Sequence, residues 1–242
     1  MNLSAVNAQR RPTTMASRSQ LKTFTQRLPK IELHAHLNGS IRTSTLRELA
    51  AIAGADPDGV LIKQGDARSL TEMFKVFDII HKAVRGGDSV RRIAKEMLED
   101  AEADGVIYLE ITTTPRAHLE CDLSKEAYVE AVLAGMQNYK DSAVEERQCH
   151  SRLLLSIDRR DSSKSADDTV SLAISYQEAG VVGVDLSGDP TQGQWETWAP
   201  ALARARTAGL KIALHAGEVA DTDEETRKML DFSPVRQCSD RC

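Results

Sequence analysis

The sequence has 242 residues, enough for one large domain or two small ones. Its formal net charge of −5 at pH 7 is modest, and residues of both signs are spread along most of the chain, which argues against nucleic acid as a partner. No apolar run approaches the roughly 18 residues that a membrane-spanning helix requires, so we expect no membrane partner.

Residues 1–27 are expected to form a disordered leader. The first 30 residues contain no Asp or Glu but several Arg, Ser and Thr. This composition also fits an organellar transit peptide, an alternative that the residues leave open. We favour the disordered leader and a cytosolic location.

From residue 28 onward, short β-rich runs alternate with helical patterns. Gly105, Gly180 and Gly209 each end a helical pattern and lead straight into a strand, as at the αβ junctions of a βα repeat. The strand at 181–187 begins as a continuous apolar run, which is typical of a parallel strand covered on both faces. The expected strands are 30–37, 106–113, 152–158, 181–187 and 210–216, and the expected helices are 43–53, 69–84, 89–103, 124–140, 165–179 and 194–207.

The predicted fold class is α/β, in the form of a (β/α)8 barrel of which about the first five βα units are present. Polar residues suited to a site follow or end several strands, where such a barrel places its active site. Five strands cannot close a barrel, so we expect open edges at the first and fifth strands. The segment 55–66, which contains several Gly and Asp, is predicted to be an exposed insertion.

Three histidines near strand ends indicate a metal site. In a strand residues i and i+2 share a face, so His34 and His36 can reach one ion. His215 ends another predicted strand, and Glu218 follows it by three residues. Three imidazoles beside a carboxylate are typical of catalytic zinc, which lowers the pKa of water to about 7. Glu218 suits a general acid or base, although it could also be a carboxylate at a helix N-terminus.

Residues 28–40 resemble the opening of the adenosine/AMP deaminase superfamily. Residues 186–189 and 215–218 resemble two later strand motifs of that superfamily. Asn38 in place of an aspartate makes the chain most similar to the adenosine deaminase-like branch, the N6-methyl-AMP deaminases. The similarity runs from about residue 28 to about residue 236. Three further segments carry it: 113–116, 157–160 and 188–190.

The resemblance implies a metal-dependent-hydrolase-type barrel with one Zn²⁺ per subunit, held by His34, His36 and His215. It implies that Glu218 protonates the purine N1 as hydroxide adds at C6, converting N6-methyl-AMP to IMP and methylamine. It also implies a small-molecule purine nucleotide as the partner and a monomeric full-length enzyme. The substrate-contact positions implied are His36, Asn38, His81, Thr113, Thr114, Pro115, Arg116, Asp158 and Gly188.

Simpler interpretations of some of these residues stay open. His81 could be a surface residue on its helix, and Arg116 with the threonines could form a capped loop. Gly188 would let a backbone N–H approach the purine ring where a side chain would intrude.

Asn38 favours a nucleotide over a nucleoside. A carboxylate at this position would repel a 5′-phosphate, by roughly 4 kcal/mol at about 4 Å and an effective dielectric near 20. A neutral amide removes that repulsion, and Arg116 offers charge-assisted donors to the phosphate. The alternative substrate is adenosine, as for a nucleoside deaminase.

The C-terminal residues depart from the family pattern. After Arg236 the family continues with Ile-Gly-His, whereas this chain has Gln-Cys-Ser-Asp-Arg-Cys, so we expect 237–242 to be a non-family tail. The family's further histidine and its later aspartate pair cannot be placed. We therefore expect residues 28–236 to be the N-terminal part of a deaminase barrel, truncated at the C-terminus, and the 242-residue chain itself to be inactive. The alternative is a non-catalytic truncated isoform or a gene-model fragment.

Overall fold

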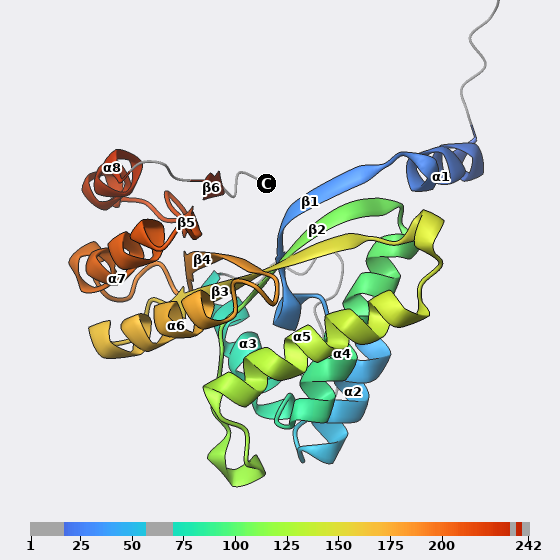
Figure 1. Cartoon of the computed structure of the whole chain (residues 1–242), viewed down its shortest axis with the longest axis horizontal. Helices are drawn as coiled ribbons and strands as arrows, with labels where there is room; N and C mark the ends of the chain where they lie inside the picture. The colour runs from blue at the N-terminus through green and yellow to red at the C-terminus, as the bar shows by residue number, and fades with distance from the viewer. Residues whose placement is uncertain (1–16, 57–69, 233–235, 239–242) are drawn as a thin grey trace, which may run out of the picture.

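The computed structural model describes residues 17–56, 70–232 and 236–238 (Figure 1). Within them, six parallel strands form one sheet in the order β1-β2-β3-β4-β5-β6. Because neighbours in sequence are neighbours in the sheet, each connection repeats the previous one and the sheet curves as part of a barrel wall. The strands are β1 (Lys30–His36), β2 (Val106–Thr113), β3 (His150–Asp158), β4 (Val181–Ser187), β5 (Lys211–His215) and β6 (Arg236–Cys238).

Helices connect the strands and cover the outer face of the sheet (Figure 1). Ser124 and Ser162 cap two of them, because their side chains accept hydrogen bonds from Ala127 N and Ser165 N. Within the described residues, no helix is long and apolar enough to cross a membrane. The helices are α1 (Arg18–Arg27), α2 (Thr43–Ile52), α3 (Leu70–Ala83), α4 (Gly87–Ala103), α5 (Lys125–Ser142), α6 (Ser163–Ser175), α7 (Trp195–Thr207) and α8 (Asp223–Asp231).

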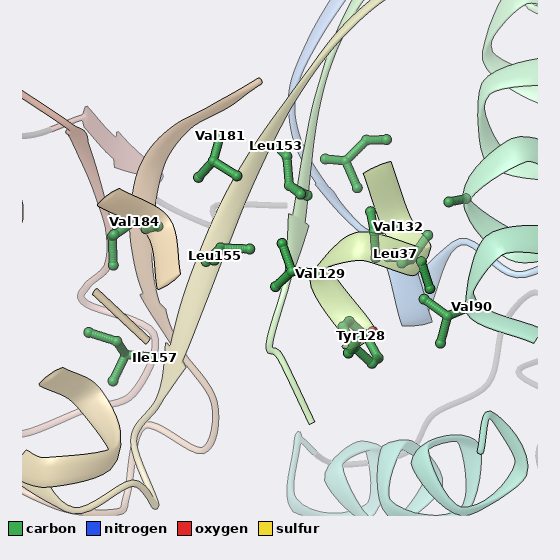
Figure 2. Packing of buried hydrophobic residues seen from close by; sticks show 14 of the residues in the cluster. Leu37, Val90, Tyr128, Val129, Val132, Leu153, Leu155, Ile157, Val181 and Val184 are labelled. Atoms are coloured by element: carbon green, nitrogen blue, oxygen red, sulfur yellow. The ribbon is translucent and has the colours of Figure 1, made fainter. Parts of the chain in front are cut away.

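The core lies between the sheet and these helices. Leu153, Leu155 and Ile157 of β3 have no exposed surface, and Leu154, which points to the opposite face, is 3% exposed. Figure 2 shows the first three of these residues near buried side chains of β4 and α5, among them Val184 and Val129. Alternate residues of a strand point to opposite faces, so a strand apolar at consecutive positions must be covered on both. The same holds for β4, whose continuous apolar run predicted a parallel strand: Val181 and Val184 are 1% and 0% exposed.

The structure confirms the fold class and the five predicted strands, and it corrects two details of the sheet and its flanks. A sixth strand, β6, pairs with β5, so the prediction of an open edge at the fifth strand is wrong. The helix α1 occupies Arg18–Arg27, so the predicted disorder is wrong for this part of the leader. Residues 1–16 and most of the predicted insertion lie outside the described residues.

The last residues of five neighbouring strands are polar. They are His36 of β1, Thr113 of β2, Asp158 of β3, Ser187 of β4 and His215 of β5. Parallel strands in this order bring their carboxyl ends to one edge of the wall, where a barrel carries its site.

Candidate functional site

The three predicted metal ligands converge. His34 Nε2 lies 2.9 Å from both His36 Nε2 and His215 Nε2, and the remaining pair is 3.3 Å apart. A circle through the three nitrogens has a radius of roughly 1.8 Å, so a point about 1 Å above their plane lies about 2.0–2.1 Å from each, the length of a Zn–N bond. The cluster therefore fits one zinc ion in both geometry and donor type.

Glu218 holds His215 in this orientation. Its Oε1 lies 2.9 Å from His215 Nδ1, and the carboxylate is 13% exposed. A carboxylate that accepts the Nδ1 proton leaves the Nε2 lone pair facing the cluster, as is usual for metal-binding histidines. The sequence predicted Glu218 as an acid or base, and the structure adds this orienting contact.

Asp185 was missed by the sequence-based prediction. It is 1% exposed on β4, and its Oδ2 lies 3.7 Å from His215 Nε2 and accepts a 2.9 Å hydrogen bond from Ser156. The signal was an aspartate inside the apolar run of β4, since a carboxylate is rarely buried without a partner.

A cavity of about 220 Å³, here called the main cavity, lies beside the histidines. Among the predicted site residues, only Pro115 is outside its lining; Pro115 borders a neighbouring cavity. The predicted residues that line it are His34, His36, Asn38, His81, Thr113, Thr114, Arg116, Asp158, Gly188, His215 and Glu218. The lining residues that the sequence did not predict are Gly39, Phe74, Phe77, Thr112, Arg160 and Ser187.

Asn38 and Thr113 meet at a buried tyrosine. Asn38 Nδ2 donates to Tyr128 Oη at 3.4 Å, and Thr113 Oγ1 lies 2.8 Å from the same oxygen. Burial raises the pKa of Tyr128 despite these contacts, so the phenol stays protonated. Asn38 Oδ1 is buried with no hydrogen-bond partner among the described residues, and it therefore remains available to a ligand.

Asp158 lies between two arginines. Its Oδ2 is 2.8 Å from Arg160 Nη2 and 3.2 Å from Arg116 Nη2. Burial raises the pKa of Asp158, but hydrogen bonds from the Arg160 side chain and backbone outweigh it and hold the pKa below its usual value. Asp158 is therefore a carboxylate at neutral pH and fixes both guanidinium groups at the cavity.

Position 188 requires glycine for two reasons: its backbone conformation and the closeness of the Asp158 side chain. Its φ is +102°, and a Cβ here would lie 2.9 Å from Asp158 Oδ1 and 3.1 Å from Arg159 N. No other residue fits both conditions without displacing that carboxylate.

His81 lies on the face of α3 that turns toward the main cavity, stacked on Phe77 with ring centroids 6.5 Å apart. Its Nδ1 is buried and has no hydrogen-bond partner among the described residues. Burial, together with the nearby Arg116 charge, lowers the pKa of His81 to about 3. The ring is therefore neutral at pH 7. The surface interpretation does not hold.

Because the pKa of His81 is low in the folded chain, we expect this residue to make the free energy of unfolding depend on pH. The unfolded chain takes up a proton at His81 near pH 6.5, whereas the folded chain does not until about pH 3, so stability is lost as the pH falls below 6.5. Between pH 7.5 and 5.5 the His81→Gln variant should lose about 1.4 kcal/mol less unfolding free energy than the parent chain. Urea unfolding at the two pH values measures this difference. Equal losses in the two proteins would place the His81 pKa near its ordinary value.

Several known proteins are similar to this chain over most of its length. The family model described as Adenosine deaminase matches residues 29–231. The curated N6-mAMP deaminase of Arabidopsis thaliana is 44% identical over 236 residues, covering 87% of this chain and 66% of the relative. The crystal structure of Arabidopsis ADAL complexed with IMP matches with a TM-score of 0.80 and 46% identity, covering 88% of this chain and 65% of that one.

A more distant structure, an amidohydrolase from Burkhoderia ambifaria with bound Zn, matches with a TM-score of 0.72 and 26% identity, covering 86% of this chain and 57% of that chain. The chain thus spans slightly less than two thirds of the length of the first relatives that it matches. Because the family model matches most of the sequence, and the relative that is 44% identical agrees, this chain belongs to the adenosine deaminase family.

Proposed function

We propose that this chain binds one Zn²⁺ through His34, His36 and His215 and serves the hydrolytic deamination of N6-methyl-AMP to IMP and methylamine. The observation that carries the proposal is the convergence of three imidazole Nε2 atoms within 3.3 Å at a cavity that Glu218 also lines. Two names support the substrate class: a curated Arabidopsis relative is called an N6-mAMP deaminase, and a similar Arabidopsis structure, ADAL, is a complex with IMP.

Zinc, when bound, supplies the activation of water at neutral pH. The chain's own residues supply the rest. One oxygen of Glu218 accepts the His215 Nδ1–H at the cavity wall, and the other would carry a proton from the attacking water to the purine N1, which makes C6 electrophilic. Phe74 and Phe77 provide an apolar wall that would exclude water from the ring.

The same cavity supports a nucleotide rather than a nucleoside. Asn38 is neutral and 9% exposed, and Arg116 presents a guanidinium to the cavity. A neutral amide and a cationic group in one cavity favour an anionic ligand. The sequence predicted the same preference for a phosphate from Asn38 and Arg116. Adenosine remains the alternative substrate, and the experiments below separate the two.

Turnover is tested in a fusion protein, because the chain spans less than two thirds of its relatives. Residues 28–232 of this chain are joined to the C-terminal third of the Arabidopsis relative, and IMP formation from N6-methyl-AMP is followed by chromatography. We expect the fusion to form IMP and to leave adenosine almost unchanged. Adenosine turnover comparable with that of N6-methyl-AMP would favour the nucleoside deaminase, and inactivity toward both would contradict the proposal.

Replacing Asn38 with aspartate should penalise the nucleotide selectively. At an effective dielectric near 20, a carboxylate at this position opposes phosphate binding by roughly 4 kcal/mol per unit charge at about 4 Å, and still by roughly 2 kcal/mol, or about 30-fold, at about 8 Å. We expect kcat/KM of the fusion for N6-methyl-AMP to fall by about 30-fold or more, and that for N6-methyladenosine to change little. Asn38→Ala is the uncharged control. Equal losses for both substrates would show that Asn38 does not sense the phosphate.

A further inference from the structure

Glu218 lies in the short connection between β5 and α8, residues 216–222, which we call the Glu218 segment. The strand β5 holds the start of this segment, because its last residue, His215, is 8% exposed. Inside the segment, Thr222 Oγ1 donates to the carbonyl oxygen of Val219 at 2.9 Å. A shift at the start of α8 would therefore be passed on to Val219, which adjoins Glu218.

Apolar packing holds the far end of α8 better than its start. The helix lies beside α7 (Figure 1), and Met229, near its end, is its one buried residue. Just after the helix, Phe232 packs on Trp195 of α7 with ring centroids 5.2 Å apart. The position of the first turn, which is the end closer to Glu218, therefore depends on polar contacts.

Glu225 supplies the largely buried polar contact of this first turn. Its Oε2 lies 2.7 Å from Arg159 Nη2, and its Oε1 lies 3.4 Å from Arg159 Nη1. The side chains of Glu225 and Arg159 are 22% and 3% exposed. The neighbouring Glu224 pairs instead with Lys228 at the surface. A carboxylate that faces a guanidinium with both oxygens fixes distance and orientation, which an exposed pair does not.

Arg159 is itself anchored to the sheet and to α7. Its backbone N–H donates to the carbonyl oxygen of Ser187, the last residue of β4, at 2.8 Å. Its guanidinium lies 5.4 Å from the centre of the Trp198 ring, and Trp198 of α7 has no exposed surface. Among the residues that the structure describes, Glu225 is the one carboxylate that pairs with Arg159. Since a buried guanidinium without its carboxylate is costly, the folded chain should keep this pair.

We propose that Glu225 is a positioning residue: its ion pair with Arg159 anchors the first turn of α8 and so holds the Glu218 segment, with Glu218 against His215 Nδ1 and at the main cavity. This inference rests on the proposed function and deepens it. Neither Glu225 nor Arg159 lines the main cavity, so the pair acts through Glu218.

The test measures the zinc affinity of the 242-residue chain by competition with a chromogenic chelator, at a temperature at which every variant is folded. We expect Glu225→Ala to lower zinc affinity by about 5- to 20-fold, because a displaced Glu218 no longer orients His215. Glu225→Gln, which keeps one acceptor for Arg159, should lose less. Lys228→Ala is the matched control, since Lys228 lies on the same helix and pairs with Glu196 of α7 at 2.8 Å, but at the surface. Its zinc affinity should stay within about twofold of that of the parent.

A double variant shows whether the effect passes through Glu218. In Glu218→Ala the acceptor that orients His215 is already lost, so adding Glu225→Ala should lower zinc affinity by no more than a further factor of about two. A pair that only stabilises the fold would lower the unfolding temperature of Glu225→Ala and leave its zinc affinity unchanged. That result, or two losses that add in full in the double variant, would overturn the positioning role.

Turnover of the fusion protein gives a second readout and separates the two proposals. For Glu225→Ala we expect kcat for N6-methyl-AMP to fall by about 10-fold and KM to change by less than about threefold, because Glu218 acts on the reacting atoms. An unchanged kcat would count against the positioning role. If the parent fusion forms no IMP, the proposed function fails, and the zinc affinities still decide on Glu225. If the parent chain binds no zinc, both proposals are refuted. Should Glu225→Ala not fold, Glu225→Gln decides alone.

Discussion

Replacing Glu218 with glutamine is expected to lower the turnover of N6-methyl-AMP by about 10²- to 10⁴-fold, the usual effect of removing a positioned acid or base. The fusion protein is assayed at saturating zinc. Glutamine keeps an oxygen that can accept the His215 Nδ1 proton, the contact that the carboxylate makes at 2.9 Å. The zinc affinity of the Glu218→Gln variant should therefore change by less than about tenfold.

Glu218→Ala separates the two roles of this carboxylate. It removes the acid and also the hydrogen-bond acceptor that orients His215, so zinc affinity should fall by about 10- to 100-fold in addition to the loss of turnover. Turnover of Glu218→Gln within about threefold of the parent fusion would show that Glu218 orients His215 only and is not the proton donor.

Removing one of the three histidines is expected to have a large effect on zinc affinity. His215→Ala should lower zinc affinity by at least about 100-fold, more than the loss of a group that only supports a ligand. Competition with a chromogenic chelator measures this in the 242-residue chain and needs no turnover. The matched control is His150→Ala, because His150 begins β3 at the opposite end of the sheet and borders a different cavity. Unchanged zinc binding in His215→Ala would exclude the three-histidine site.

The strands and the histidine cluster could be predicted because both follow from local patterns. Alternation placed His34 and His36 on one face, and βα repetition placed His215 at the same end of the sheet. In contrast, β6 spans only Arg236–Cys238 and has no apolar pattern of its own, so its pairing with β5 is invisible in sequence. The helix α1 buries no side chain, and the sequence signal at its start is the capping box of Ser17 and Gln20.

The parts of the site that were missed depend on contacts between distant segments. Arg160 joins Asp158, two residues away, to Asp78 on α3, and only the folded chain brings these groups together. Likewise, Asp185 contacts His215 on the next strand, and the sequence alone does not place these two residues together. Glu218 was predicted to be an acid or base from its spacing, but its contact with His215 Nδ1 required coordinates.

We propose the main cavity as a zinc-dependent site for a 6-substituted purine nucleotide. The most direct measurement is calorimetric titration of the 242-residue chain with N6-methyl-AMP and with N6-methyladenosine, each with zinc bound and after chelation. We expect the zinc-loaded chain to bind N6-methyl-AMP at least about 10-fold more tightly than the nucleoside, and chelation to weaken this binding. Equal affinity for the two ligands, or nucleotide binding that does not change when zinc is removed, would refute the proposed site.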